Sequence, residues 1–184
     1  MTSLARLIRL SAALVLGLLG FMATAAFAGD LPAEGDTLPN LTFAAPPNPQ
    51  DAKELGVGGK ASFTLAELDR PVVLLEVVGV YCSQCARQAP LFNNLHRRLK
   101  RRGLLDRTAM IALAAGATPQ EAAYLRSGGR YNYPVITDQD YSLHKLLGEP
   151  ETPYTMLVTS DGKVLFAKLG VEQDIEGLYQ RIKE

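Results

Sequence analysis

An apolar run rich in β-branched residues, PVVLLEVVG from Pro71 to Gly79, limits the folds open to this chain. The run lacks polar alternation, so it predicts a strand buried on both faces at the centre of a sheet. A second apolar run at 107–116 predicts a neighbouring strand. Between the two runs, leucines and Phe92 recur at helical spacing up to Gly103, which predicts a helix that connects the strands.

The segments that follow complete an α/β pattern. We expect a helix at 118–129, a short strand or turn at 133–138, a short helix at 139–148, a β-hairpin at 154–170 around Asp161-Gly162, and an amphipathic helix at 171–184. From Ser62 a strand edge passes into one helical turn. The preceding segment, 29–61, is rich in Pro and Gly and is expected to be extended or looped, with at most short strands. The chain therefore predicts an α/β domain over 62–184 that follows a loop-rich extension.

The composition excludes several classes of protein. A chain of 184 residues suits one compact domain with additions. Hydrophobic residues at 47% and charged residues at 21% are ordinary values for a folded protein. A formal net charge of +0 argues against nucleic acid as a partner, because such binding needs a basic face. The 2 cysteines are too few for a disulfide-stapled scaffold or a zinc finger.

The first residues have the pattern of a secretory signal peptide. Arg6 and Arg9 precede the apolar run 10–21, and Ala26-Phe27-Ala28 follows as a small-residue cleavage pattern. We therefore expect export to the periplasm, with residues 1–28 removed. The alternative is an uncleaved anchor, since 10–28 is almost long enough to span a bilayer and would tether the protein to the membrane.

Cys82 and Cys85, two residues apart, follow the first predicted strand and open the predicted helix. Such a pair can hold half a metal site, form an inert bridge or carry out redox chemistry. Free N–H groups at a helix start stabilise a thiolate, so Cys82 should attack and Cys85 should resolve. The metal interpretation lacks further ligands, because His96 and His144 do not have the spacing of a site with the pair. A bridge closing so short a loop would stabilise the fold little. We therefore expect redox chemistry with no metal and no bound cofactor.

At these residues the chain resembles the TlpA/ResA-type thiol–disulfide oxidoreductases, the exported branch of the thioredoxin superfamily. The resemblance runs from Gly35 to Glu184. It is carried by EGDTLPNLTF, by VVLLEVVGVYCSQC with Pro90 after it, by YPVITD and by ETPYTMLVTSDGKVLFAKLG. It implies a thioredoxin fold, in which helices flank a central mixed β-sheet.

The resemblance also implies roles for residues around the cysteines. Thr152-Pro153 matches the family's cis-proline element, where Thr152 would offer main-chain groups to a substrate strand; the alternative is a trans proline that starts a strand. Glu76 lies where thioredoxin has a buried acid. Burial would raise its pKa so that it can take the proton of Cys85, unless it points to a solvated edge. Tyr81 stands where the family has tryptophan and would contact the partner.

The implied function is reduction of disulfides in partner proteins, for example during cytochrome c maturation. The histidine-free Ser83-Gln84 between the cysteines favours a reductant. In an oxidising compartment this chemistry requires a membrane electron donor, and we expect the protein to be a monomer. The alternative is a copper-binding metallochaperone or a redox-silent binding module, for which His144 is the histidine at hand.

Overall fold

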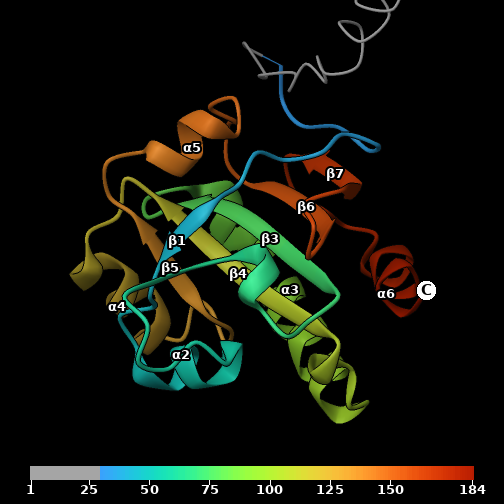
Figure 1. Ribbon diagram of the computed structural model, residues 1–184, viewed down its shortest axis with the longest axis horizontal. Coiled ribbons are helices and arrows are strands. Elements are labelled where there is room, and N and C mark those ends of the chain that lie inside the picture. Colours follow the sequence, from blue (N-terminus) through green and yellow to red (C-terminus); the bar gives the residue numbers. More distant parts are fainter. Residues whose placement is uncertain (1–29) are drawn as a thin grey trace, which may run out of the picture.

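The computed structural model of the protein describes residues 30–184, so the expected signal peptide at 1–28 lies outside the described part. Figure 1 shows a central sheet with helices on both faces. The sheet has 5 strands in the order β5-β4-β3-β6-β7, and β1 and β2 form a separate pair. The strands are β1 (Thr42–Ala44), β2 (Ser62–Thr64), β3 (Val72–Gly79), β4 (Thr108–Ala115), β5 (Val135–Asp138), β6 (Tyr154–Thr159) and β7 (Val164–Leu169). The α-helices are α2 (Pro49–Leu55), α3 (Ser83–Arg101), α4 (Pro119–Ser127), α5 (Ser142–Leu146) and α6 (Ile175–Lys183).

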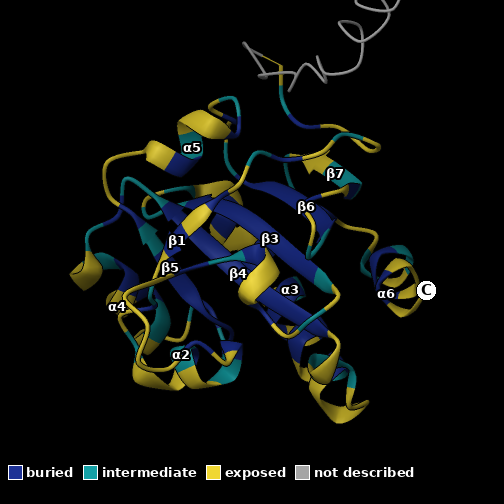
Figure 2. Cartoon of the chain, in the orientation of Figure 1, coloured by how far each residue is buried: buried dark blue, intermediate teal, exposed yellow. Residues whose placement is uncertain are grey.

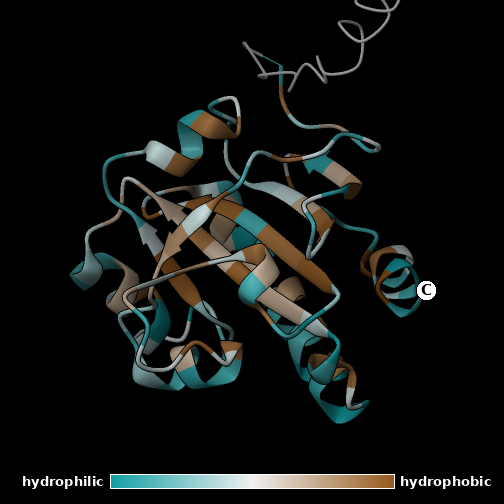
Figure 3. Cartoon of the chain, in the orientation of Figure 1, coloured by the Kyte–Doolittle hydropathy of each residue, from teal (hydrophilic) through white to brown (hydrophobic). Residues whose placement is uncertain are grey.

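The predicted central strand, β3, lies in the middle of the sheet. It runs parallel to β4 and antiparallel to β6, while β5 and β7 form the edges. Strands β3 and β4 are almost wholly buried in Figure 2 and predominantly hydrophobic in Figure 3. This mixed sheet flanked by helices is the fold that the resemblance implied. The strand or turn expected at 133–138 is strand β5, and Asp161-Gly162 joins β6 to β7 as predicted.

Alternate residues of β3 contribute to two separate cores, because successive side chains point to opposite faces of a sheet. Val73, Leu75 and Val77 pack under β1, β2, α2 and α5. Leu74 and Val78 pack with residues of α3, α4 and α6, and Cys85 belongs to the same cluster. Glu76, between Leu74 and Val78 in the alternation, therefore faces α3.

The expectation of at most short strands within 29–61 is wrong for Pro49–Leu55, which form helix α2. The residues that start and end this helix lie next to it in the sequence. The side chain of Asn48 accepts a hydrogen bond from the N–H of Gln50, Pro49 occupies the first turn, and Gly56 ends the helix in a left-handed conformation at φ 74°. The helix is held to α4 by the buried Asp51 carboxylate, which accepts a hydrogen bond from Nε of Arg126 at 2.8 Å.

Helix α3 begins directly after Cys82, which is its N-cap, and continues for 19 residues with Pro90 inside it. One face of the helix is buried against the sheet and includes Cys85, Gln88 and Phe92. Across residues 30–184, no helix combines the length and the apolar composition needed to cross a membrane.

Candidate active site

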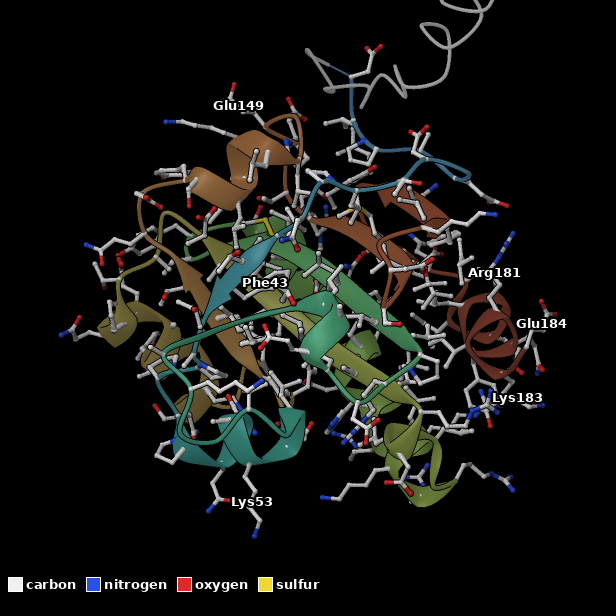
Figure 4. All side chains as sticks on the ribbon, in the orientation of Figure 1. Phe43, Lys53, Glu149, Arg181, Lys183 and Glu184 are labelled. Carbon is white, nitrogen blue, oxygen red and sulfur yellow. A yellow bond between two sulfur atoms is a disulfide. The ribbon has the colours of Figure 1, made fainter. Side chains whose placement is uncertain are left out.

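Cys82 and Cys85 form a disulfide where β3 passes into α3, drawn as a yellow bond in Figure 4. Their Cα atoms are 5.3 Å apart. The two sulfurs differ in environment, since Cys82 is partly exposed and Cys85 is 0% exposed. The N–H of Cys85 points at Sγ of Cys82 at 3.0 Å. This donor and the helix N-terminus both stabilise negative charge on Cys82, so Cys82 has the features of the attacking thiol.

The loop before β6 lies against the exposed sulfur. The Thr152–Pro153 peptide bond is cis, and the carbonyl oxygen of Thr152 lies 3.4 Å from Sγ of Cys82. In the disulfide, Sγ of Cys82 carries no proton and this contact is not a hydrogen bond. The reduced Cys82 thiol can donate a hydrogen bond to the same oxygen. Gly79 leaves room for the contact, because a Cβ there would lie 3.3 Å from both Cβ of Cys82 and Oγ1 of Thr152.

Glu76 lies in the interior of the protein, 1% exposed, on the face of β3 that packs against α3. Burial raises the pKa of its carboxyl from 4.5 to about 7, although hydrogen bonds from Tyr133 and Gln88 act in the opposite direction. The hydroxyl of Tyr133 donates to Oε2 at 2.5 Å, and Nε2 of Gln88 donates to Oε1 at 2.8 Å. A carboxyl whose pKa lies near neutrality can both accept and release a proton under physiological conditions.

The partners of Glu76 were not found from the sequence. Gln88 lies one helical turn after Cys85, 0% exposed, and Tyr133 is 1% exposed. Gln88 had one recognisable signal, an amide on the apolar face of an amphipathic helix next to the cysteines. Tyr133 had none, because its contact with Glu76 spans 57 positions and depends on how β4 and β5 pair.

Tyr81 is 90% exposed beside the disulfide, and its hydroxyl donates to Oε1 of Glu121 at 3.2 Å. Together with the exposed Tyr124 it lines a shallow pocket of about 420 Å³. This surface can receive an apolar group of a molecule that approaches Cys82.

Both histidines have a hydrogen-bond partner at Nε2 within the protein. Nε2 of His96 lies 2.9 Å from Oε1 of Glu54, and Nε2 of His144 lies 3.0 Å from the carbonyl oxygen of Pro150. In the described part of the chain, no three His, Cys, Asp or Glu side chains gather as a metal site would require.

Known proteins of similar sequence are thiol–disulfide enzymes and redox proteins by name. The Redoxin family model matches residues 33–182. Thiol-disulfide oxidoreductase ResA of Halalkalibacterium halodurans is 27% identical over 126 residues, which cover 66% of this chain and 68% of that protein.

Solved structures match over a larger share of the chain. The thioredoxin domain of a thiol-disulfide oxidoreductase from Bacteroides vulgatus aligns with a TM-score of 0.60 and 17% identity, over 83% of this chain and 96% of that one. A secreted disulfide oxidoreductase of Mycobacterium tuberculosis aligns with a TM-score of 0.57 and 16% identity, over 78% of this chain and 94% of that one. At these identities the structural likeness establishes the thioredoxin-like fold.

Proposed function

The chain belongs to the Redoxin family and is a thiol–disulfide oxidoreductase, and from that premise we propose that it is exported and reduces disulfides of partner proteins through Cys82 and Cys85. The proposal depends above all on the asymmetry of the pair. One sulfur is partly exposed beside the cis-proline loop, and the other is buried on the face that holds Glu76. That arrangement suits a first attack at the surface and a second one from inside.

In the first step, the Cys82 thiolate of the reduced protein attacks one sulfur of a partner disulfide. The partner's S–S bond breaks, a mixed disulfide with Cys82 forms, and the released partner thiolate takes a proton from solvent. The N–H of Cys85, 3.0 Å from Sγ of Cys82, favours the thiolate that attacks. The main-chain groups of Thr152 and the exposed ring of Tyr81 would hold the partner chain.

In the second step, Cys85 must lose its proton before it can attack Sγ of Cys82. We assign the acceptor as the Glu76 carboxylate. This group faces α3 and accepts a hydrogen bond from Gln88, which lies one helical turn after Cys85. The Cys85 thiolate then displaces the partner's second thiol and closes the Cys82–Cys85 disulfide. Two electrons have passed to the partner, and a dithiol donor at the membrane would return the protein to its reduced form.

The reducing direction rests on the residues between the cysteines. Ser83 and Gln84 are both exposed and include no histidine, so nothing there over-stabilises the thiolate in the way that makes strong oxidants. Partners in cytochrome c maturation and a monomeric state fit this assignment and belong to the same proposal.

Insulin reduction with dithiothreitol as electron source tests the activity. After reduction and removal of the dithiothreitol, we expect Cys85→Ser to accumulate a mixed disulfide with insulin that migrates as a larger species on a non-reducing gel, and Cys82→Ser to form none. Alkylation of the reduced protein at pH 7 should modify Cys82 well before Cys85. Equal alkylation rates at the two thiols would contradict the assignment of roles.

A further inference from the structure

Gln88 makes more hydrogen bonds inside the protein than a side chain that merely fills space requires. Its Nε2 donates to Oε1 of Glu76 at 2.8 Å and to Oγ1 of Thr155 at 3.1 Å. Its Oε1 accepts from the main-chain N–H of Glu172 at 2.6 Å. The amide thus joins the helix of the cysteines to β3, to β6 and to the segment before α6.

These contacts fix which end of the amide faces the carboxyl. A main-chain N–H can only donate, so the segment at Glu172 requires the oxygen end of Gln88. The NH₂ end is then directed at Glu76 and Thr155. Gln88 consequently presents a donor to Oε1 of Glu76 whether or not the carboxyl is ionised, and a protonated Oε1 would place two hydrogens against each other.

The other carboxyl oxygen has a different partner. Oε2 of Glu76 accepts from the hydroxyl of Tyr133, and a hydroxyl can either donate or accept after rotation about its C–O bond. A proton on Oε2 therefore keeps a hydrogen-bond partner, whereas a proton on Oε1 loses one.

We infer that Gln88 is a positioning residue that holds the Glu76 carboxyl through Oε1, keeps that oxygen unprotonated and directs proton uptake to Oε2 beside Tyr133. The inference rests on the proposed function, in which Glu76 accepts the proton of Cys85. In that scheme Gln88 favours the charged carboxylate, so it also sets the pH range over which Glu76 can act.

The test is a titration of Glu76 by ¹³C NMR of labelled glutamate carboxyls in the oxidised protein, with the signal assigned by its loss in Glu76→Gln. The wild-type midpoint is expected at about 7. Gln88→Leu removes a donor to the carboxylate and should move the midpoint upward by about one pH unit. Gln88→Glu keeps the shape of the side chain and places a second carboxyl against the first, so it should also raise the midpoint.

Asn93→Leu is the matched control. Asn93 is another buried amide of α3; it donates to the carbonyl of Arg130 and accepts from the N–H of Asn132, and it makes no hydrogen bond with Glu76. Its loss should destabilise the protein and leave the midpoint in place. If Gln88→Leu does not fold, Gln88→Glu decides the question.

A wild-type midpoint in the folded Gln88 variants, or an equal displacement in Asn93→Leu, would overturn the inference. The pH dependence of the second step, measured as the rate at which insulin leaves the mixed disulfide, should move in the same direction as the midpoint in the Gln88 variants. Wild-type protein that fails to reduce insulin would count against the proposed function alone, because the NMR midpoints would still report whether Gln88 controls Glu76.

Discussion

Replacing Glu76 by Gln should change how the stability of the oxidised protein depends on pH. The pKa of this buried carboxyl is about 7 in the folded protein, against an ordinary value of 4.5. Between those two pH values the folded state holds a proton that the unfolded state has released. Within this range the free energy of unfolding therefore falls as the pH rises, and the contribution of the Glu76 proton to stability is lost above about pH 7.

The magnitude follows from the two pKa values. Raising the pKa from 4.5 to about 7 corresponds to roughly 3 kcal/mol, at about 1.36 kcal/mol for each pH unit. Gln keeps the shape of Glu but does not titrate, and Tyr133 can turn its hydroxyl to accept from the new amide. The stability of Glu76→Gln relative to wild type should therefore rise by about 3 kcal/mol between pH 4 and pH 8.

Urea unfolding at intervals of half a pH unit, with the disulfide intact, measures this difference directly. Other titrating groups are common to both proteins and cancel in the comparison. Parallel stability curves for the two proteins across this range would refute the reasoning, since they would mean that Glu76 has an ordinary pKa in the folded state.

Two other substitutions test a close contact beside Cys82 and the ion pair between α2 and α4. Gly79→Ala would place a Cβ 3.3 Å from both Cβ of Cys82 and Oγ1 of Thr152. We therefore expect slower insulin reduction with an unchanged circular dichroism spectrum. Full activity would show that the loop at Thr152 moves to accommodate the added methyl group. Arg126→Met would leave the buried Asp51 carboxylate without its cation and should lower the free energy of unfolding by about 3–5 kcal/mol in urea. A loss below about 1 kcal/mol would mean that the pair contributes no more than an exposed salt bridge.

The sequence predicted the parts of the fold and site that local pattern determines. The buried strand at 71–79, the cysteines at a helix start and the turn at Asp161-Gly162 each depend on neighbours a few positions away. Helix α2 was also within reach, because Asn48, Pro49 and Gly56 are ordinary signals for the start and end of a helix. The Pro and Gly content of the surrounding segment concealed them.

The contacts that tune the site were beyond sequence reasoning. Gln88 binds Thr155 and Glu172, 67 and 84 positions away, and these partners meet only once the sheet has its register. His96 stands in a basic run, HRRLKRR, yet it is buried, and its Nε2 lies within hydrogen-bond distance of Glu54 in α2, 42 positions away. The sequence pattern can indicate that a polar residue is buried, but it does not identify the distant group that forms the hydrogen bond with it.

The reduction potential of the Cys82–Cys85 pair tests the central claim most directly. Equilibration of the protein with mixtures of reduced and oxidised dithiothreitol or glutathione, followed by acid trapping and alkylation, reports the fraction of each form. A reductant should have a potential closer to the roughly −270 mV of thioredoxin than to the roughly −120 mV of a strong oxidant. A potential near −120 mV would mean that electrons flow in the opposite direction, and a disulfide that none of these mixtures opens would mean that the pair is structural.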